Sequence, residues 1–284
     1  MEGTVAYLGP EGTFSQEAVR ACPTLKGFTE RPYATIAQVF EAVLAGEAEC
    51  GLVPIENSLE GSVNLTLDLL IHRGGLFINR EMVLPIRNNL LAAEGTGLAD
   101  IRGVISHPQP LAQCGEFIRR TFPGVETRAA NSTTEAVMRV RELPNWAAIG
   151  TAIAAELYGL KVLARDIQDN DANYTRFVVL SRGEQPPTGK DKTSLACSLD
   201  RDRPGGLYEV LGEFALRGIN LTKIESRPAK VGLGSYIFLI DCEGHHADPA
   251  CREALEGVRG RTFFFKLLGS YPSGGALAQG QINS

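Results

Sequence analysis

The chain has 284 residues, enough for two or three domains that each bury a core of their own. Its hydrophobic fraction of 44% and charged fraction of 21% are ordinary for a globular protein, and no apolar run reaches the roughly 20 residues that span a bilayer. The net charge of -5 argues against nucleic-acid binding, which usually needs a basic patch. We therefore expect neither a membrane protein nor a nucleic-acid-binding one.

The N-terminus and the cysteines indicate the compartment. The first residues lack the basic and apolar regions of a secretory signal, so we expect a cytoplasmic protein. Six cysteines are scattered without close pairing, which predicts free thiols and no disulfides. Cys242, His245, His246 and Cys251 cluster loosely, but their spacing does not match a paired zinc motif, and we expect no metal.

Short apolar strands alternate with amphipathic helices from residue 4 to residue 182. Strands are expected at 4–8, 50–54, 103–106, 125–129 and 147–149, with strand segments through 77–92. Capping boxes predict helices that start at Thr13, Thr35 and Ser132, and other helices are expected at 62–71, 108–121 and 151–158. The alternation predicts mainly parallel sheets covered by helices, arranged as two α/β lobes within residues 1–182.

A second domain follows a short linker. Residues 183–191 lack apolar periodicity and concentrate turn residues, which indicates the linker. Strand 193–199, helix 206–217, strands 220–227 and 235–242, helix 249–258 and strand 262–268 are then predicted. This βαββαβ order is the ferredoxin-like arrangement, and the domain spans residues 192–272. Residues 273–284 are rich in Gly, Ala, Gln and Ser, and we expect a disordered tail.

Two polar motifs follow predicted strands in the first part of the chain. Residues 9–15 read Gly-Pro-Glu-Gly-Thr-Phe-Ser and run into a helix, without the spacing of a nucleotide-binding glycine motif. Residues 54–62 place Asn57, with both a donor and an acceptor, at the end of a strand. Each motif alone is also compatible with ordinary turn chemistry.

Two further motifs lie later in the chain. Residues 106–109 place Ser106 before a helix that carries Gln113 about one turn further. By default Ser106 is a helix cap and His107 a solvated loop histidine. Residues 169–177 pass from a polar turn into a strand, in which Thr175 faces one side and Arg176 the other. Asn173 and Phe177 share the face of Thr175.

The order of these motifs, together with residues 131–136 and 225–228, closely resembles the prephenate dehydratase family over residues 4 to about 272. The resemblance implies an α/β, two-lobed catalytic domain, similar to type 2 periplasmic binding proteins, followed by an α+β ferredoxin-like ACT domain. No helical chorismate mutase segment precedes Thr4, so the chain resembles the monofunctional form. The implied reaction is the decarboxylating dehydration of prephenate to phenylpyruvate in phenylalanine biosynthesis, without a cofactor.

The resemblance also assigns site residues. The family's catalytic threonine falls on Thr175 of Thr-Arg-Phe. Substrate-binding positions fall on residues of several motifs: Asn57, Ser106, Gln113, Thr133, Arg176 and Phe177. A positioned proton donor would help hydroxide to leave the ring, a contribution of about 10²–10⁴-fold. Thr175 either transfers its proton or only donates a hydrogen bond, and helix N-termini after Thr13, Ser106 and Ser132 could hold the carboxylates of the substrate.

The implied effector site lies in the second domain. In this family a Gly-Ala-Leu motif and a Glu-Ser-Arg-Pro motif bind phenylalanine at an interface between ACT domains. The effector-binding positions of this chain are Gly205, Gly206, Leu207, Glu225, Ser226, Arg227 and Pro228. Gly206 replaces the family's alanine and loosens the helix start, which puts the strength of regulation in question. Binding at such an interface favours a homodimer or a homotetramer.

Two alternatives stay open. Arogenate dehydratase catalyses the same reaction on the transaminated substrate and shares these motifs. A non-catalytic amino-acid sensor is the alternative from another class, because two-lobed folds also serve solute-binding proteins. The presence of Thr175 together with Asn57 and Gln113 argues against a sensor, which has no need of a catalytic threonine.

Overall fold

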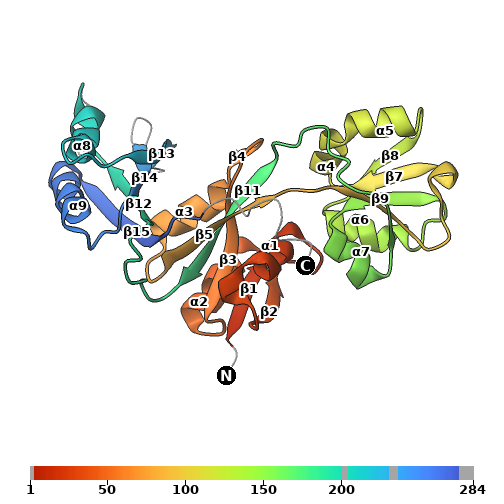
Figure 1. The fold of residues 1–284 in the computed structure, drawn as a ribbon, viewed down its shortest axis with the longest axis horizontal. Helices are drawn as coiled ribbons and strands as arrows, with labels where there is room; N and C mark the ends of the chain where they lie inside the picture. Colours follow the sequence, from red (N-terminus) through yellow and green to blue (C-terminus); the bar gives the residue numbers. More distant parts are fainter. Residues whose placement is uncertain (1–2, 200–203, 230–235, 275–284) are drawn as a thin grey trace.

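The computed structural model describes residues 3–199, 204–229 and 236–274. Three β-sheets with their helices lie in a row, so that the C-terminal domain and the second lobe occupy opposite ends of an elongated molecule (Figure 1). Among the described helices, none has the length and apolar composition needed to cross a bilayer. Residue 235 of one predicted strand and residues 275–284 of the predicted tail lie outside the described ranges.

The first lobe contains a six-stranded sheet in the order β2-β1-β3-β11-β5, with β4 paired to β3. Its strands are β1 (Thr4–Leu8), β2 (Thr29–Tyr33), β3 (Cys50–Asn57), β4 (Gly61–Ser62), β5 (Phe77–Pro85) and β11 (Tyr174–Ser181). Its helical segments are α1 (Phe14–Ala21), η1 (Pro23–Leu25), α2 (Ile36–Ala45) and α3 (Asn64–His72). The helix starts agree with the sequence, because the Thr13 and Thr35 hydroxyls accept from the N–H groups of Gln16 and Gln38.

The second lobe contains a five-stranded sheet in the order β10-β6-β9-β7-β8. Its strands are β6 (Asn89–Ala92), β7 (Gly103–Ser106), β8 (Glu126–Ala129), β9 (Trp146–Gly150) and β10 (Lys161–Ala164). Its helical segments are η2 (Leu98–Asp100), α4 (Pro108–Gln113), α5 (Gly115–Thr121), α6 (Thr133–Val140) and α7 (Ala152–Tyr158). The chain crosses between the lobes at residues 86–88 and returns at residues 165–173 (Figure 1).

Several elements differ from the sequence prediction. Both sheets are mixed instead of mainly parallel, because β5 and β11 pair antiparallel in the first lobe and β6 pairs antiparallel in the second. The predicted helix 108–121 breaks at Cys114, where Asp169 from the returning crossover accepts from the N–H groups of Glu116 and Phe117 and caps α5. The edge strand β2 is mostly exposed and contains Glu30, Arg31 and Pro32, so its pattern does not resemble a strand.

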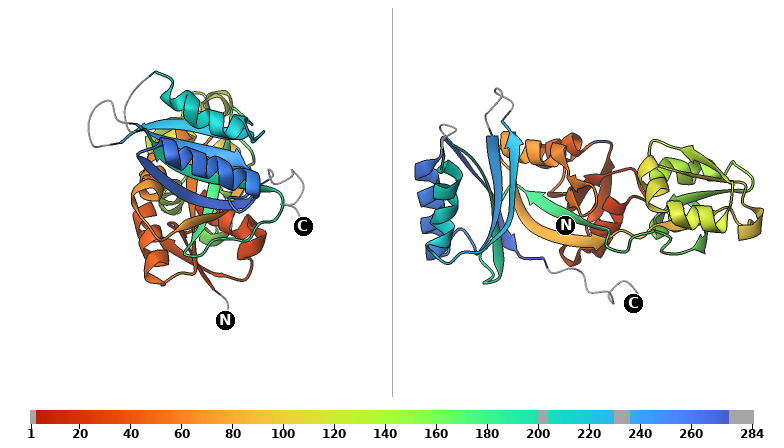
Figure 2. Two further views of the ribbon diagram at one scale, coloured as in Figure 1. Left: turned by 90° about the vertical axis from the view of Figure 1, so that its left-hand side faces the viewer. Right: turned by 90° about the horizontal axis from the view of Figure 1, so that it is seen from above.

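The C-terminal domain has the predicted βαββαβ order, and its antiparallel sheet runs β13-β14-β12-β15. Its elements are β12 (Asp191–Ser198), α8 (Gly206–Ala215), β13 (Leu221–Pro228), β14 (Tyr236–Glu243), α9 (Pro249–Arg261) and β15 (Phe264–Pro272). Both helices cover one face of this sheet (Figure 2). Together with the two lobes, this domain confirms the predicted fold class.

The other face of the C-terminal sheet packs directly on the first lobe. Ala196, Leu239 and Leu268 join the buried cluster that α2 and α3 form with the first sheet. Lys266 extends into this interface, where its Nζ donates to the carbonyls of Leu70 and Ile71 at the end of α3, at 2.6 and 3.0 Å. The C-terminal domain and the first lobe thus share one continuous hydrophobic core.

Candidate active site

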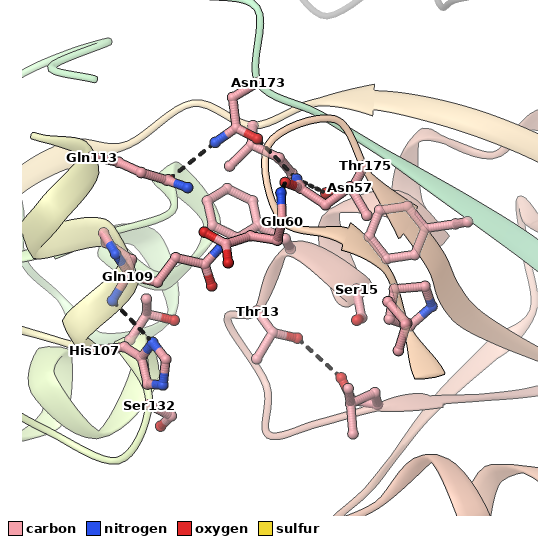
Figure 3. A pocket seen from close by; sticks show the side chains of 18 of the residues that line it. Thr13, Ser15, Asn57, Glu60, His107, Gln109, Gln113, Ser132, Asn173 and Thr175 are labelled. Carbon is pink, nitrogen blue, oxygen red and sulfur yellow. Dashed lines mark hydrogen bonds between the residues drawn. The ribbon is translucent and has the colours of Figure 1, made fainter. Parts of the chain in front are cut away.

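A cleft of about 440 Å³ lies between the two lobes (Figure 3). The first lobe contributes the turns that follow β1 and β3, and the second lobe contributes the starts of α4 and α6. The polar lining includes Thr13, Ser15, Asn57, Glu60, Ser62, Asn88, His107, Gln109, Gln113, Asn131, Ser132, Thr133, Asn173 and Thr175. These turns follow the carboxyl ends of β1, β3, β7 and β8, which is where α/β folds commonly place their sites.

A chain of side-chain hydrogen bonds joins the two lobes across this cleft (Figure 3). Asn57 Nδ2 donates to Thr175 Oγ1 at 2.9 Å and to Asn173 Oδ1 at 2.8 Å. Asn173 Nδ2 in turn donates to Gln113 Oε1 at 3.0 Å. Thr175 and Asn57 are register partners on β11 and β3, so backbone pairing fixes their relative position. The hydroxyl proton of Thr175 remains available for a molecule in the cleft.

The turn after β3 is organised by the same asparagine. Asn57 Oδ1 accepts from the N–H groups of Leu59 and Glu60, both at 3.0 Å. This Asx-type turn uses the acceptor of Asn57 locally and directs its donor toward Thr175. The sequence identified Asn57 as a turn residue with a donor and an acceptor, and the structure uses both.

Two buried polar atoms beside the hydrogen-bond chain have no partner. They are Gln113 Nε2, a donor, and Asn88 Oδ1, an acceptor, and both residues line the cleft. Buried polar groups are normally hydrogen-bonded, so these two atoms are available to a bound ligand. Asn88 could not be predicted from the sequence, because the crossover 86–88 carries no recognisable motif.

The charges of the cleft are few. Among the described residues that line it, Glu60 carries the single carboxylate, and neither Lys nor Arg is present. An anionic ligand therefore depends on neutral donors such as hydroxyl and backbone N–H groups. The starts of α1 and α6, capped by Thr13 and Ser132, both border the cleft and offer such N–H groups. Thr133, at the first position of α6, adds a hydroxyl.

The structure brings five predicted site residues together in this cleft: Asn57, Gln113, Thr133, Thr175 and Phe177. Ser106 lies outside it, because this fully buried side chain donates to the carbonyl of Ile149 at 2.8 Å. Arg176 also lies outside, on the opposite face of β11. The expected substrate contacts of Ser106 and Arg176 do not fit these positions.

Arg176 belongs instead to a buried polar ring at the interface with the C-terminal domain. Its guanidinium donates to Asp241 Oδ2 at 2.8 Å and to Tyr271 Oη at 2.9 Å. Ser194 Oγ closes the ring, 2.5 Å from Tyr271 Oη and 2.6 Å from Asp241 Oδ1. Complete burial raises the pKa of Tyr271, so its hydroxyl stays protonated and donates to Ser194. Glu81 of β5 is a further ion-pair partner of Arg176 beside this ring, with its Oε2 2.7 Å from Arg176 Nε.

Comparison with known proteins decides the family. The sequence pattern described as prephenate dehydratase matches residues 5–185, and the pattern described as ACT domain matches residues 193–260. The chain belongs to the prephenate dehydratase family. A bifunctional chorismate mutase/prephenate dehydratase of Stutzerimonas stutzeri is 45% identical over 94% of this chain and 73% of the relative.

Two solved structures share the whole architecture. A prephenate dehydratase of Arthrobacter aurescens in complex with L-Phe superposes with a TM-score of 0.88, at 39% identity, covering 95% of this chain and 90% of that one. A protein described as GqqA, a novel type of quorum quenching acylase, superposes with a TM-score of 0.86, at 35% identity, covering 95% and 98%. Both TM-scores show that these two proteins have the same fold as the present prephenate dehydratase family member.

The predicted effector residues of the ACT domain lie at the start of α8 and the end of β13. Gly205 has a left-handed backbone with φ of 82°, and buried Gly206 begins α8 ahead of Leu207. Along β13 the side chains alternate, so that Ser226 and Pro228 are exposed while Glu225 and Arg227 turn toward the first lobe.

Two contacts attach this effector motif to the first lobe. Glu225 Oε2 accepts from Ser62 Oγ at 2.5 Å, and Ser62 lines the cleft. Arg227 Nη2 pairs with Asp68 of α3 at 2.8 Å. The effector motif is therefore one hydrogen bond away from a residue that lines the cleft.

Proposed function

We propose that this chain converts prephenate to phenylpyruvate in the cleft between its lobes, with Thr175 acting on the departing hydroxyl. The observation that carries the proposal is the hydrogen bond from Asn57 Nδ2 to Thr175 Oγ1, in a cleft that belongs to a prephenate dehydratase fold. The test is phenylpyruvate formation from prephenate by the purified chain, with and without a chelator. Activity that a chelator abolishes and added metal restores would refute the metal-free reaction.

The main task of the protein in this reaction is to stabilise the departing hydroxide. The bond from the ring to its carboxylate breaks and its electron pair enters the ring, while the bond to the ring hydroxyl breaks and hydroxide leaves. One proton is taken up, so that the products are phenylpyruvate, carbon dioxide and water. Thr175 is placed to give a hydrogen bond or this proton, and Asn57 Nδ2 would stabilise negative charge on Oγ1.

The remaining polar groups orient the substrate. The free Nε2 of Gln113 and the Thr133 hydroxyl are donors for carboxylate or keto oxygens. N–H groups at the starts of α1 and α6 supply further neutral donors. Phe177, almost fully buried, gives the ring an apolar surface. Comparing turnover of prephenate and arogenate by the same preparation separates the two dehydratase activities.

An acylase activity, as described for GqqA, has less support in this cleft. A threonine that attacks an acyl group requires a base within hydrogen-bond reach of its hydroxyl. Thr175 Oγ1 receives the amide donor of Asn57, and within the described part of the chain no carboxylate or imidazole hydrogen-bonds to it. Assaying acyl-homoserine lactone cleavage beside prephenate turnover tests this reading directly.

We also propose that phenylalanine regulates the enzyme through Gly205, Gly206 and Leu207 together with Glu225 to Pro228. The support is the match of the ACT pattern and the L-Phe complex of the Arthrobacter protein. Calorimetric titration of phenylalanine, with activity followed in parallel, tests the proposal. Inhibition that is purely competitive with prephenate would contradict regulation at a separate site.

A cytoplasmic homodimer or homotetramer is the proposed working form. The ACT domain exposes large apolar side chains that an interface would cover: Tyr208, Leu216, Ile224, Tyr236 and Phe263. Light scattering coupled to size exclusion, with and without phenylalanine, measures the number of subunits. A monomer under both conditions would contradict this assembly.

A further inference from the structure

The strand pair that carries Asn57 and Thr175 also faces the ACT domain. Arg176 on β11 is the register partner of Glu56 on β3, directly beside the pair Thr175 and Asn57. Because side chains alternate along a strand, Asn57 and Thr175 face the cleft while Glu56 and Arg176 face the ACT sheet. A displacement of Glu56 and Arg176 would therefore reach the cleft pair through a single peptide unit.

Both members of this second pair are held by charged ACT residues. Arg176, with a side chain 12% exposed, lies 2.8 Å from Asp241 of β14. Glu56 Oε2 lies 2.9 Å from Lys223 Nζ of β13. Arg176 Nη1 also lies 3.7 Å from Glu56 Oε2, so the two residues form an ion pair with each other. The neighbouring ACT strands β13 and β14 thus each place a charged side chain against one of the two strands that carry Asn57 and Thr175.

The contact is more specific than domain attachment requires. The apolar residues Ala196, Leu239 and Leu268 already pack the ACT sheet on the first lobe. A buried ion pair adds little stability beyond what apolar residues of equal volume give, but it fixes one relative placement of its partners. The closed ring through Tyr271 and Ser194 gives the guanidinium a single orientation.

We propose that Glu56 and Arg176 are positioning residues through which the ACT sheet sets the geometry of Asn57 and Thr175. The proposal rests on the proposed function, because it takes Asn57 and Thr175 as the groups that act on the substrate. Neither Glu56 nor Arg176 lines the cleft, so the pair acts through the strands that it shares with Asn57 and Thr175.

The test compares substitutions on both sides of this contact. Arg176→Lys keeps the cation but loses the paired donors, and Asp241→Asn removes the opposing charge from the ACT side. We expect each to lower kcat at least about fivefold with KM within about twofold. Lys266→Met is the control, since it cuts another ACT contact to the first lobe, and its kcat should stay within about twofold.

A second readout does not depend on turnover. Hydrogen exchange of the backbone amides in residues 55–60 should speed up in Asp241→Asn and stay unchanged in Lys266→Met. Thermal unfolding sets an assay temperature at which every variant is folded. Unchanged kcat and exchange in both Arg176→Lys and Asp241→Asn, or an equal loss in Lys266→Met, would overturn the proposal. A wild type without any prephenate turnover would instead refute the proposed function.

Discussion

Asn57 Nδ2 donates to Thr175 Oγ1 at 2.9 Å, across two strands that hold both residues in register. The amide would stabilise negative charge that develops on this hydroxyl, as a donor of an oxyanion hole does. We expect Asn57→Ala to lower kcat by about 10²-fold or more. Steady-state kinetics with prephenate measure this change in kcat. Asn170→Ala, which removes an asparagine outside the cleft, is the control, and an equal loss there would contradict the assignment.

Gln113 is expected to act mainly in binding. Its Nε2 is buried without a partner, and a hydrogen bond to a charged ligand group contributes about 1.5–3 kcal/mol. Gln113→Ala should therefore raise KM by about tenfold or more, with a smaller change in kcat. Gln38→Ala, at the start of α2, provides a matched amide control. A fall in kcat at unchanged KM would place Gln113 in the chemical step.

Gly206 occupies the position of alanine in the family's effector motif. Alanine is favoured over glycine in a helix by about 0.5–1 kcal/mol, so Gly206→Ala should stabilise the start of α8. We expect phenylalanine to bind this variant up to about fivefold more tightly, as calorimetric titration would show. Weaker binding or none would mean that the glycine suits this particular site.

Stability should depend on pH through Glu17 in the first turn of α1. Burial raises the pKa of this carboxyl from 4.5 to about 7. Between these values the unfolded chain loses a proton that the folded chain keeps, so the stability present below pH 4.5 is lost as pH rises to about 7. Glu17→Gln does not titrate, so its free energy of unfolding should exceed that of the wild type by about 3 kcal/mol at pH 8 but not at pH 4.

Urea unfolding at both pH values measures this difference. The control is Gln38→Ala, which removes no titratable group and should change stability equally at the two pH values. A stability gain in Glu17→Gln that is the same at pH 4 and pH 8 would show that the carboxyl titrates alike in both states.

Local chemistry explains what the sequence predicted. The Thr35 and Gln38 caps act within one turn of helix, and they locate the start of α2 without knowledge of the fold. Strand alternation likewise predicted that Thr175 and Arg176 face opposite sides. The substrate contact expected of Arg176 came from its motif, and the alternation rule was the better guide to its position.

Long-range contacts explain what the sequence missed. The Ser106 hydroxyl donates a hydrogen bond to the carbonyl of Ile149 on the neighbouring strand β9. A residue that was expected in the cleft is therefore buried in the sheet. Asp169 breaks the helix predicted at 108–121 by capping α5 from a distant crossover. Asn88 meets Gln113 only because the crossover into β6 passes beside the end of α4, 25 residues further along the chain. No local pattern carries such information.

The role of Thr175 is tested most simply by the rate of phenylpyruvate formation from prephenate by the wild type and by Thr175→Ala. We predict turnover by the wild type without added cofactor, and a fall in kcat of about 10²–10⁴-fold in the variant with KM nearly unchanged. Thr175→Ser, which keeps the hydroxyl, should retain more activity than the alanine variant. A Thr175→Ala enzyme that forms phenylpyruvate at the wild-type rate would show that Thr175 does not act on the departing hydroxyl.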